Sequence, residues 1–176
     1  MTAWLVGIDF QRVFAEGSPW AAPRYREAAA GFARLRTAFA ARTVLTRYVA
    51  PATPIGAWVE YFEQWPFALV PPDDPLYDLT VPVEDASVVT RETFGKWGPA
   101  LAAAVPGASE LVVGGVSTDC CVLSTVLPAA DAGIRVRVVA DACAGASDED
   151  HRRALDAMAL YAPLVEITSV DDLLRH

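Results

Sequence analysis

Short apolar runs alternate with longer amphipathic stretches along this chain. The amphipathic stretches carry apolar residues at helical spacing, as in Ala28, Phe32, Leu35 and Phe39. This alternation is typical of an α/β fold with a parallel sheet. The pattern predicts six strands, over residues 4–8, 43–47, 87–90, 110–114, 135–140 and 164–168. It predicts helices over residues 23–41, 55–64, 98–105, 120–132, 148–161 and 170–174.

The length of 176 residues favours one domain. We therefore expect a single domain over residues 1–176, with an open, mainly parallel six-stranded sheet flanked by helices. Hydrophobic residues make up 53% of the chain, which argues against disorder. No apolar run is long enough to span a membrane, because charges or prolines interrupt each one.

The charge and the cysteines narrow the class of partner and the compartment. A net charge of −8 argues against nucleic acid and anionic membranes as partners, and it leaves small molecules and other proteins. Three cysteines, two of them adjacent, do not form a disulfide framework. The N-terminus lacks the basic segment and cleavage site of a signal peptide. We therefore expect a cytoplasmic protein with a small-molecule substrate.

Three chemically useful groups follow three different predicted strands. Asp9 ends the first strand, Arg91 ends the third, and Cys121 follows the fourth after a short turn. The carboxyl ends of parallel strands meet at one edge of the sheet, where ligands bind in open α/β folds. Each group alone has a structural explanation as a cap, a surface charge or a core thiol. Their coincidence at one edge indicates an active site.

The thiol at the start of the fourth predicted helix has two interpretations. A cysteine in the first turn of a helix lies near converging N–H groups and the positive end of the helix dipole. This position predicts a thiolate with a lowered pKa and a place for an oxyanion. Alternatively, Cys120 and Cys121 are two buried cysteines that act as small hydrophobic residues.

Three stretches resemble motifs of the isochorismatase-like cysteine hydrolase superfamily, which includes nicotinamidases, N-carbamoylsarcosine amidases, ureidoacrylate-type amidases and isochorismatases. They are residues 5–14 (LVGIDFQRVF), residues 88–97 (VVTRETFGKW) and residues 114–143 (GGVSTDCCVLSTVLPAADAGIRVRVVADAC). The first resembles the strand-one motif D-x-Q-x-x-F, and the third resembles the family's G-V-x-T-x-x-C-V helix start. The resemblance implies a Rossmann-type three-layer sandwich and no cofactor.

The resemblance also implies roles for individual residues. Cys121 occupies the position of the nucleophile, and Asp9 that of the general base. The backbone N–H groups of Ser117 and Cys121 would form the oxyanion hole, and the Val116–Ser117 peptide bond would be cis. Cys120 falls at a variable position, and Cys143 is expected to be structural. The implied reaction is nucleophilic acyl transfer from an amide or related carbonyl through a thioester.

The chain departs from the family pattern in two places. Arg91 stands at the family's lysine position, and it keeps the charge but cannot give up a proton. Lys96 lies five residues further on and could reach the site from the loop, although a solvated loop lysine is the favoured interpretation. Nicotinamidases of the family carry an Asp-x-His…His metal cluster after strand two, whereas residues 46–51 here contain no histidine. His151 and His176 lack ligand spacing, so we expect no metal site, which argues against nicotinamide.

Aromatic residues indicate the substrate pocket and a second surface. We expect four of them to line a pocket for a flat or apolar substrate, with local core packing as the alternative: Phe14, Trp20, Phe94 and Trp97. Another four share one face of a predicted helix and could form a homo-oligomer contact: Trp58, Tyr61, Phe62 and Trp65.

The sequence therefore favours a metal-independent cysteine hydrolase that cleaves an amide or carbamoyl-type C–N bond of a small molecule. An isochorismatase-type vinyl-ether hydrolase is one alternative, although such enzymes can lack the cysteine that is present here. A non-catalytic ligand-binding or interaction subunit is another alternative. Its support is Arg91, which could mark a lapsed active site.

Overall fold

The computed structural model describes residues 2–175 and contains one open sheet of six parallel strands. The strands are β1 (Ala3–Ile8), β2 (Thr43–Tyr48), β3 (Ser87–Arg91), β4 (Glu110–Val116), β5 (Arg135–Ala144) and β6 (Val165–Thr168). Their order across the sheet is β3-β2-β1-β4-β5-β6, and every neighbouring pair is parallel. The predicted fold class is confirmed.

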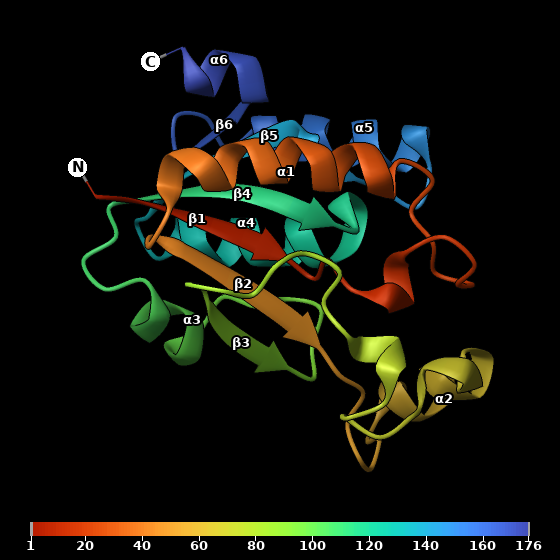
Figure 1. Ribbon diagram of the computed structural model, residues 1–176. Helices are drawn as coiled ribbons and strands as arrows, with labels where there is room; N and C mark the ends of the chain where they lie inside the picture. The colour runs from red at the N-terminus through yellow and green to blue at the C-terminus, as the bar shows by residue number, and fades with distance from the viewer. Residues whose placement is uncertain (1, 176) are drawn as a thin grey trace.

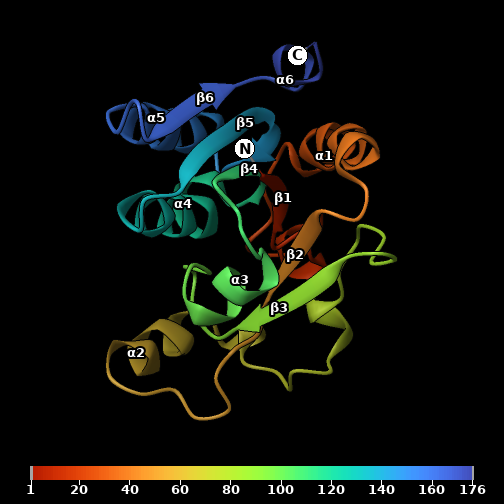
Figure 2. The same ribbon diagram turned by 90° about the vertical axis from the view of Figure 1, so that its left-hand side faces the viewer.

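Among residues 2–175, six α-helices lie on the two faces of the sheet or in the connections between its strands. They are α1 (Tyr25–Phe39), α2 (Ala57–Gln64), α3 (Pro99–Ala104), α4 (Leu123–Asp131), α5 (Asp148–Ala159) and α6 (Val170–Leu174). Helices α1 and α6 lie on one face, and α4 and α5 lie on the other (Figure 2). Helix α2 belongs to the long connection between β2 and β3 and lies away from the sheet (Figure 1).

The chain order reverses at the centre of the sheet. From β1 the chain first moves outward to β2 and β3, and it then returns to β4 on the other side of β1. Such a switch point leaves a crevice beyond the carboxyl ends of the two central strands. Asp9 follows β1, and the turn that contains Cys121 follows β4, so the topology brings these two segments to the same crevice.

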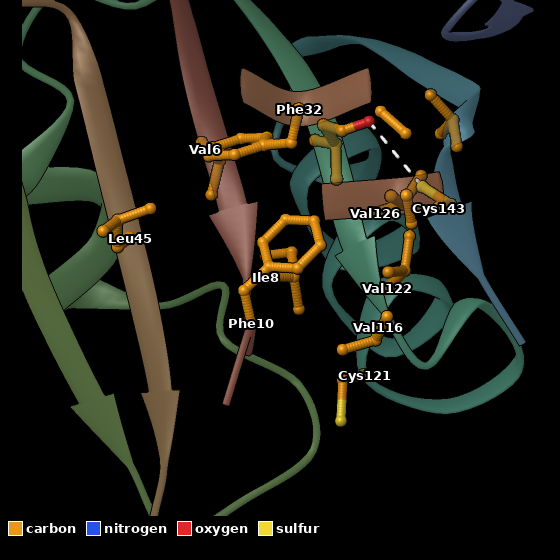
Figure 3. Close-up of a cluster of buried hydrophobic side chains, with 14 of the residues drawn as sticks. Val6, Ile8, Phe10, Phe32, Leu45, Val116, Cys121, Val122, Val126 and Cys143 are labelled. Carbon is orange, nitrogen blue, oxygen red and sulfur yellow. Dashed lines mark hydrogen bonds between the residues drawn. The ribbon is translucent and has the colours of Figure 1, made fainter. Parts of the chain in front are cut away.

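The core explains the glycines in the two central strands. A Cβ at Gly7 would lie 2.5 Å from the Phe32 ring of α1, and one at Gly114 would lie 3.2 Å from the same ring. Small residues here let α1 approach the sheet closely. Figure 3 shows Phe32 among the core side chains, with Cys121 at the margin of the cluster and its sulfur directed away from it.

Two elements differ from the predicted boundaries by more than two residues. Strand β5 continues to Ala144, past a register shift against β4 between Val113 and Gly115. The helix expected from residue 120 is preceded by a π-helix, Thr118–Val122, and α4 begins only at Leu123. Among the helices within residues 2–175, none is both long and apolar enough to cross a membrane.

Candidate active site

Asp9 lies completely buried at the carboxyl end of β1. Its backbone has a φ of 51°, a left-handed conformation that aspartate adopts more readily than most residues. The carboxylate Oδ1 accepts a hydrogen bond of 2.6 Å from Thr46 Oγ1 on β2. The carboxylate Oδ2 lies 2.8 Å from Lys96 Nζ. A buried carboxylate is thus held in one orientation by a neighbouring strand and by a cation.

Lys96 is the cation of this site, and the expectation of a solvated loop lysine is wrong. Its side chain is 0% exposed. Besides the ion pair with Asp9, Nζ donates to the carbonyl oxygens of Thr93 at 2.6 Å and Phe94 at 2.8 Å. An ammonium has three protons. These three partners together match that donor capacity, which offsets the cost of burying the charge.

Arg91 lies apart from this pair, so its expected place beside the nucleophile is corrected. It ends β3 at the edge of the sheet, and two strands separate it from β4. Its guanidinium lies near Gly98, and it forms none of the ion pairs found within residues 2–175. The following loop carries Lys96 back toward the centre of the sheet instead.

The turn after β4 presents two thiols to the crevice. The Val116–Ser117 peptide bond is cis, as the family resemblance implied. The π-helix that follows carries Cys120, which is partly exposed, and Cys121, which is 1% exposed. Cys143 is buried on β5, where its thiol faces the carbonyl oxygen of Val113 on the neighbouring β4 at 3.9 Å (Figure 3).

The electrostatics of Cys121 differ from the sequence-based expectation of a lowered pKa. A hydrogen bond with Cys120, burial, and the charge of Asp9 raise the pKa of the Cys121 thiol well above its usual value, and Lys96 opposes the shift. The hydrogen bond from Cys121 lowers the pKa of Cys120. The contact with Cys120, burial and the Asp9 charge together therefore keep Cys121 protonated at rest, as a thiol that needs a base.

Helix α5 and the loop before it form hydrogen bonds with the turn that carries the two cysteines. Asp119 Oδ1 accepts hydrogen bonds from Ser117 Oγ at 2.5 Å and from the Ala146 N–H at 2.9 Å. Thr118 Oγ1 lies 2.8 Å from His151 Nδ1. Burial lowers the pKa of His151, although the charge of Asp148 acts in the opposite direction. No sequence motif predicted the link between His151 and the turn.

A pocket of about 310 Å³ opens above the two thiols. Aromatic side chains and a few polar groups line it: Phe14, Trp20, Tyr61, Trp65, Phe94, Ser117, Asp119, Cys120 and Cys121, with Pro19, Ala21 and Ala146. The lining thus includes three of the four aromatic residues expected there. Trp97, the fourth, lies outside it and packs against the core instead.

Trp20 packs against three other aromatic residues of the pocket lining. Its ring lies 6.0 Å from Phe14, 5.8 Å from Tyr61 and 6.1 Å from Trp65, measured between ring centroids. Two residues of the helix face expected to form an oligomer contact thus line the pocket of the same chain. Homo-oligomerisation stays a prediction.

The residues present do not fit the metal cluster that the family resemblance would suggest. Within residues 2–175, no group of three or more His, Cys, Asp or Glu side chains is arranged to hold a metal ion. The β2 residues near the site have other partners. Thr46 is hydrogen-bonded to Asp9, and the buried Tyr48 ring has its centre 5.5 Å from the Lys96 ammonium. His176 lies outside the described residues.

Comparison with known proteins agrees with the fold and the motifs. The family model described as the Isochorismatase domain matches residues 3–172. Isochorismatase domain-containing protein 2 of Xenopus laevis is 34% identical over 85 residues, which are 45% of this chain. The matched region spans only 42% of the length of that curated relative.

Solved structures with the same fold cover nearly the whole chain. An isochorismatase-like hydrolase from Alkaliphilus metalliredigens superposes with a TM-score of 0.84 at 19% identity, covering 99% of this chain and 98% of that one. A cysteine hydrolase from Pseudomonas syringae pv. phaseolicola 1448A gives 0.83 at 18% identity, covering 98% and 91%. A pyrazinamidase of Pyrococcus horikoshii, solved in complex with zinc, gives 0.78 at 24% identity, covering 95% and 98%. At these identities the structures show the shared fold, and the family model that matches residues 3–172 shows that the chain belongs to the isochorismatase-like hydrolase family.

Proposed function

We propose that the protein is a metal-independent cysteine hydrolase that cleaves an amide or carbamoyl-type C–N bond of a small molecule through a thioester. One observation carries the proposal. A fully buried Asp9–Lys96 pair, 2.8 Å apart, acts electrostatically on Cys121 at the floor of an aromatic pocket. A fully buried ion pair that acts on a thiol in the lining of a pocket is the arrangement expected where that thiol must be deprotonated on demand.

In the proposed first half-reaction, Asp9 accepts the Cys121 proton while the sulfur attacks the substrate carbonyl carbon. The C–S bond forms, and the carbonyl π electrons move to oxygen. When the carbonyl re-forms, the C–N bond breaks, and the nitrogen leaves with the proton that Asp9 returns. In the second half-reaction, water attacks the thioester carbonyl carbon and gives a proton to Asp9. The C–S bond then breaks, the acid leaves, and Asp9 returns the proton to the Cys121 sulfur.

Lys96 acts in this scheme through its fixed charge. Two loop carbonyl oxygens and Asp9 engage its ammonium, so transfer of a proton would break an established contact. Its charge lowers the pKa of Cys121 and so favours the thiolate at the moment of attack. The oxyanion is assigned to the backbone N–H groups of Ser117 and Cys121, since both residues line the pocket floor.

The pocket favours an uncharged acyl group with a flat or apolar body. Among its described lining residues there is no Lys, Arg or His, and the one ionisable carboxylate is Asp119. An anionic substrate would lose its hydration without gaining a cation. A volume of about 310 Å³ suits a small molecule.

This lining disfavours the vinyl-ether alternative, because isochorismate carries carboxylates that need cationic partners. The non-catalytic alternative also loses its support. It depended on Arg91 in the lysine position, whereas Lys96 supplies a cation at Asp9.

A substrate screen tests the proposed function. Purified protein is offered neutral amides, carbamoyl compounds and esters, together with anionic analogues, with and without a chelator. We expect turnover of a neutral C–N substrate that survives chelation and an acyl mass increment mapped to Cys121. Cys121→Ser should lose turnover, whereas Cys143→Ser, a buried thiol outside the pocket, should retain it. Turnover that requires added metal, or an acyl group on another residue, would contradict the proposal.

A further inference from the structure

The two halves of the proposed catalytic machinery come from distant parts of the sheet. Lys96 lies in the loop after β3, and Cys121 lies in the turn after β4. In the sheet, β2 and β1 separate β3 from β4, so no strand pairing fixes these two segments relative to each other. Contacts outside the sheet can therefore set their alignment.

One buried hydroxyl joins the two segments directly. Thr125 lies in the first turn of α4 and is 1% exposed. Its Oγ1 donates to the Cys121 carbonyl oxygen at 2.7 Å and accepts from the Lys96 backbone N–H at 2.9 Å. A single side-chain atom thus contacts the backbone of both residues on whose relative position the chemistry depends.

A glycine allows this contact. A Cβ built on Gly95 would lie 2.7 Å from the backbone carbonyl oxygen of Ser124. Real Cβ atoms do not come this close to a carbonyl oxygen, so only glycine lets the loop lie flat against the start of α4. The resulting approach places the Lys96 N–H within reach of the Thr125 hydroxyl.

The contact at Thr125 also affects the position of the Lys96 ammonium, because the same loop binds that ammonium through its carbonyl oxygens. Lys96 Nζ donates to the carbonyl oxygens of Thr93 and Phe94, which belong to the same short loop. A shift of the loop therefore moves the ammonium together with the backbone. Loosening at Thr125 would change the distance between the charge of Lys96 and the sulfur of Cys121.

We propose that Thr125 is a positioning residue that holds the Lys96 loop in register with Cys121. The proposal rests on the proposed function, because it assigns Thr125 a part in that reaction. The hydroxyl is the essential group, since it must donate and accept at the same time. Serine can do both, and valine, which has nearly the same shape as threonine, can do neither.

The test compares Thr125→Val and Thr125→Ser with a matched control, Thr43→Val. Thr43 is also buried, on β2, and its hydroxyl has no hydrogen-bond partner among the described residues, so the control makes the same chemical change outside the site. Two quantities are measured: kcat and KM for a substrate found in the screen, and the pH midpoint for alkylation of Cys121. The alkylation is followed by peptide mass mapping in a Cys120→Ser background.

For Thr125→Val we expect kcat to fall by about 10- to 100-fold, the scale of loss for a small misplacement of catalytic groups, with KM changing by less than about threefold. The alkylation midpoint of Cys121 should rise, because the cation that favours the thiolate is no longer held in place. Thr125→Ser should restore both quantities, and Thr43→Val should change neither. If the valine variant does not fold, Thr125→Ala serves in its place.

Wild-type kcat and an unshifted midpoint in Thr125→Val would overturn the proposal. An equal loss in Thr125→Val and Thr125→Ser would also overturn it, since it would show that the hydroxyl is not the required group. Failure of the proposed function has a different signature. Wild-type protein would then turn over none of the substrates, whereas the alkylation midpoint would still report whether Thr125 positions the cation.

Discussion

Lys96→Met removes the cation from a fully buried carboxylate and leaves a side chain of similar length. Asp9 keeps its hydrogen bond from Thr46, but Oδ2 loses the ammonium at 2.8 Å. Removing one partner of a buried ion pair typically costs about 3–5 kcal/mol, because the remaining charge is buried without compensation. The whole free energy of unfolding of a domain is about 5–15 kcal/mol, so the variant should retain only part of its stability.

This loss is large enough to measure by thermal or urea unfolding. A change of 1 kcal/mol shifts the melting temperature of a domain of this size by about 2–4 °C, so we expect a decrease of about 6–20 °C. The double variant Asp9→Asn/Lys96→Met provides the decisive comparison, because it removes both charges and keeps a group that can bond Thr46. It should recover most of the lost stability.

Activity should not follow stability in this series. The single and the double variant should both lack turnover, because one lacks the cation and the other also lacks the base. A Lys96→Met protein that melts within about 2 °C of wild type would refute the reasoning, since it would mean that Asp9 does not need its partner. Recovery of turnover in the double variant would refute the assigned roles.

Three further predictions follow from the site. Limiting iodoacetamide should label Cys120 before Cys121 in the resting protein, because Cys120 is partly exposed and its pKa is lowered, whereas that of Cys121 is raised. Substrate, in contrast, should acylate Cys121. Peptide mapping that finds the first iodoacetamide label on Cys121 would contradict the argument from burial. Gly95→Ala should reduce turnover by about 10-fold or more by displacing the Lys96 loop, and unchanged steady-state kinetics would show that the loop can move without consequence. The pKa of His151 is lowered in the folded state, so folding favours its neutral form, and the free energy of unfolding should decrease as the pH falls below about 6.5. Urea unfolding midpoints measured at successive pH values should show this decrease in the wild type and less of it in His151→Gln.

The fold could be predicted from the sequence because it rests on periodic patterns. Buried strands such as β4 appear as short apolar runs, and α1 carries its core face at helical spacing. Asp9 and Cys121 could be placed because Asp9 directly follows a strand, Cys121 follows another after a short turn, and topology brings strand ends together. The wide turn of the π-helix could not be predicted, since hydrophobic spacing does not distinguish it from the first turn of an α-helix.

The cation of the site was misplaced because Lys96 lies in a loop, where no periodicity reports burial. Alignment of the third predicted strand with the family motif therefore placed Arg91 at the lysine position. A signal was nevertheless present in the composition: Lys96 is the only lysine in a chain whose other basic side chains, histidines aside, are arginines. An ammonium can engage three acceptors around one atom, whereas a planar guanidinium cannot replace it in so small a space.

The solitary buried lysine also determines how the protein meets amine-directed chemistry. Lys96 is the one lysine in the sequence, and it is buried. The folded chain therefore has no accessible ε-amine for acylating reagents, aldehydes or amine cross-linkers. Lys96 can react only when its loop opens or the whole chain unfolds. The rate of labelling at this one residue would therefore report how often the site opens, without any engineered probe.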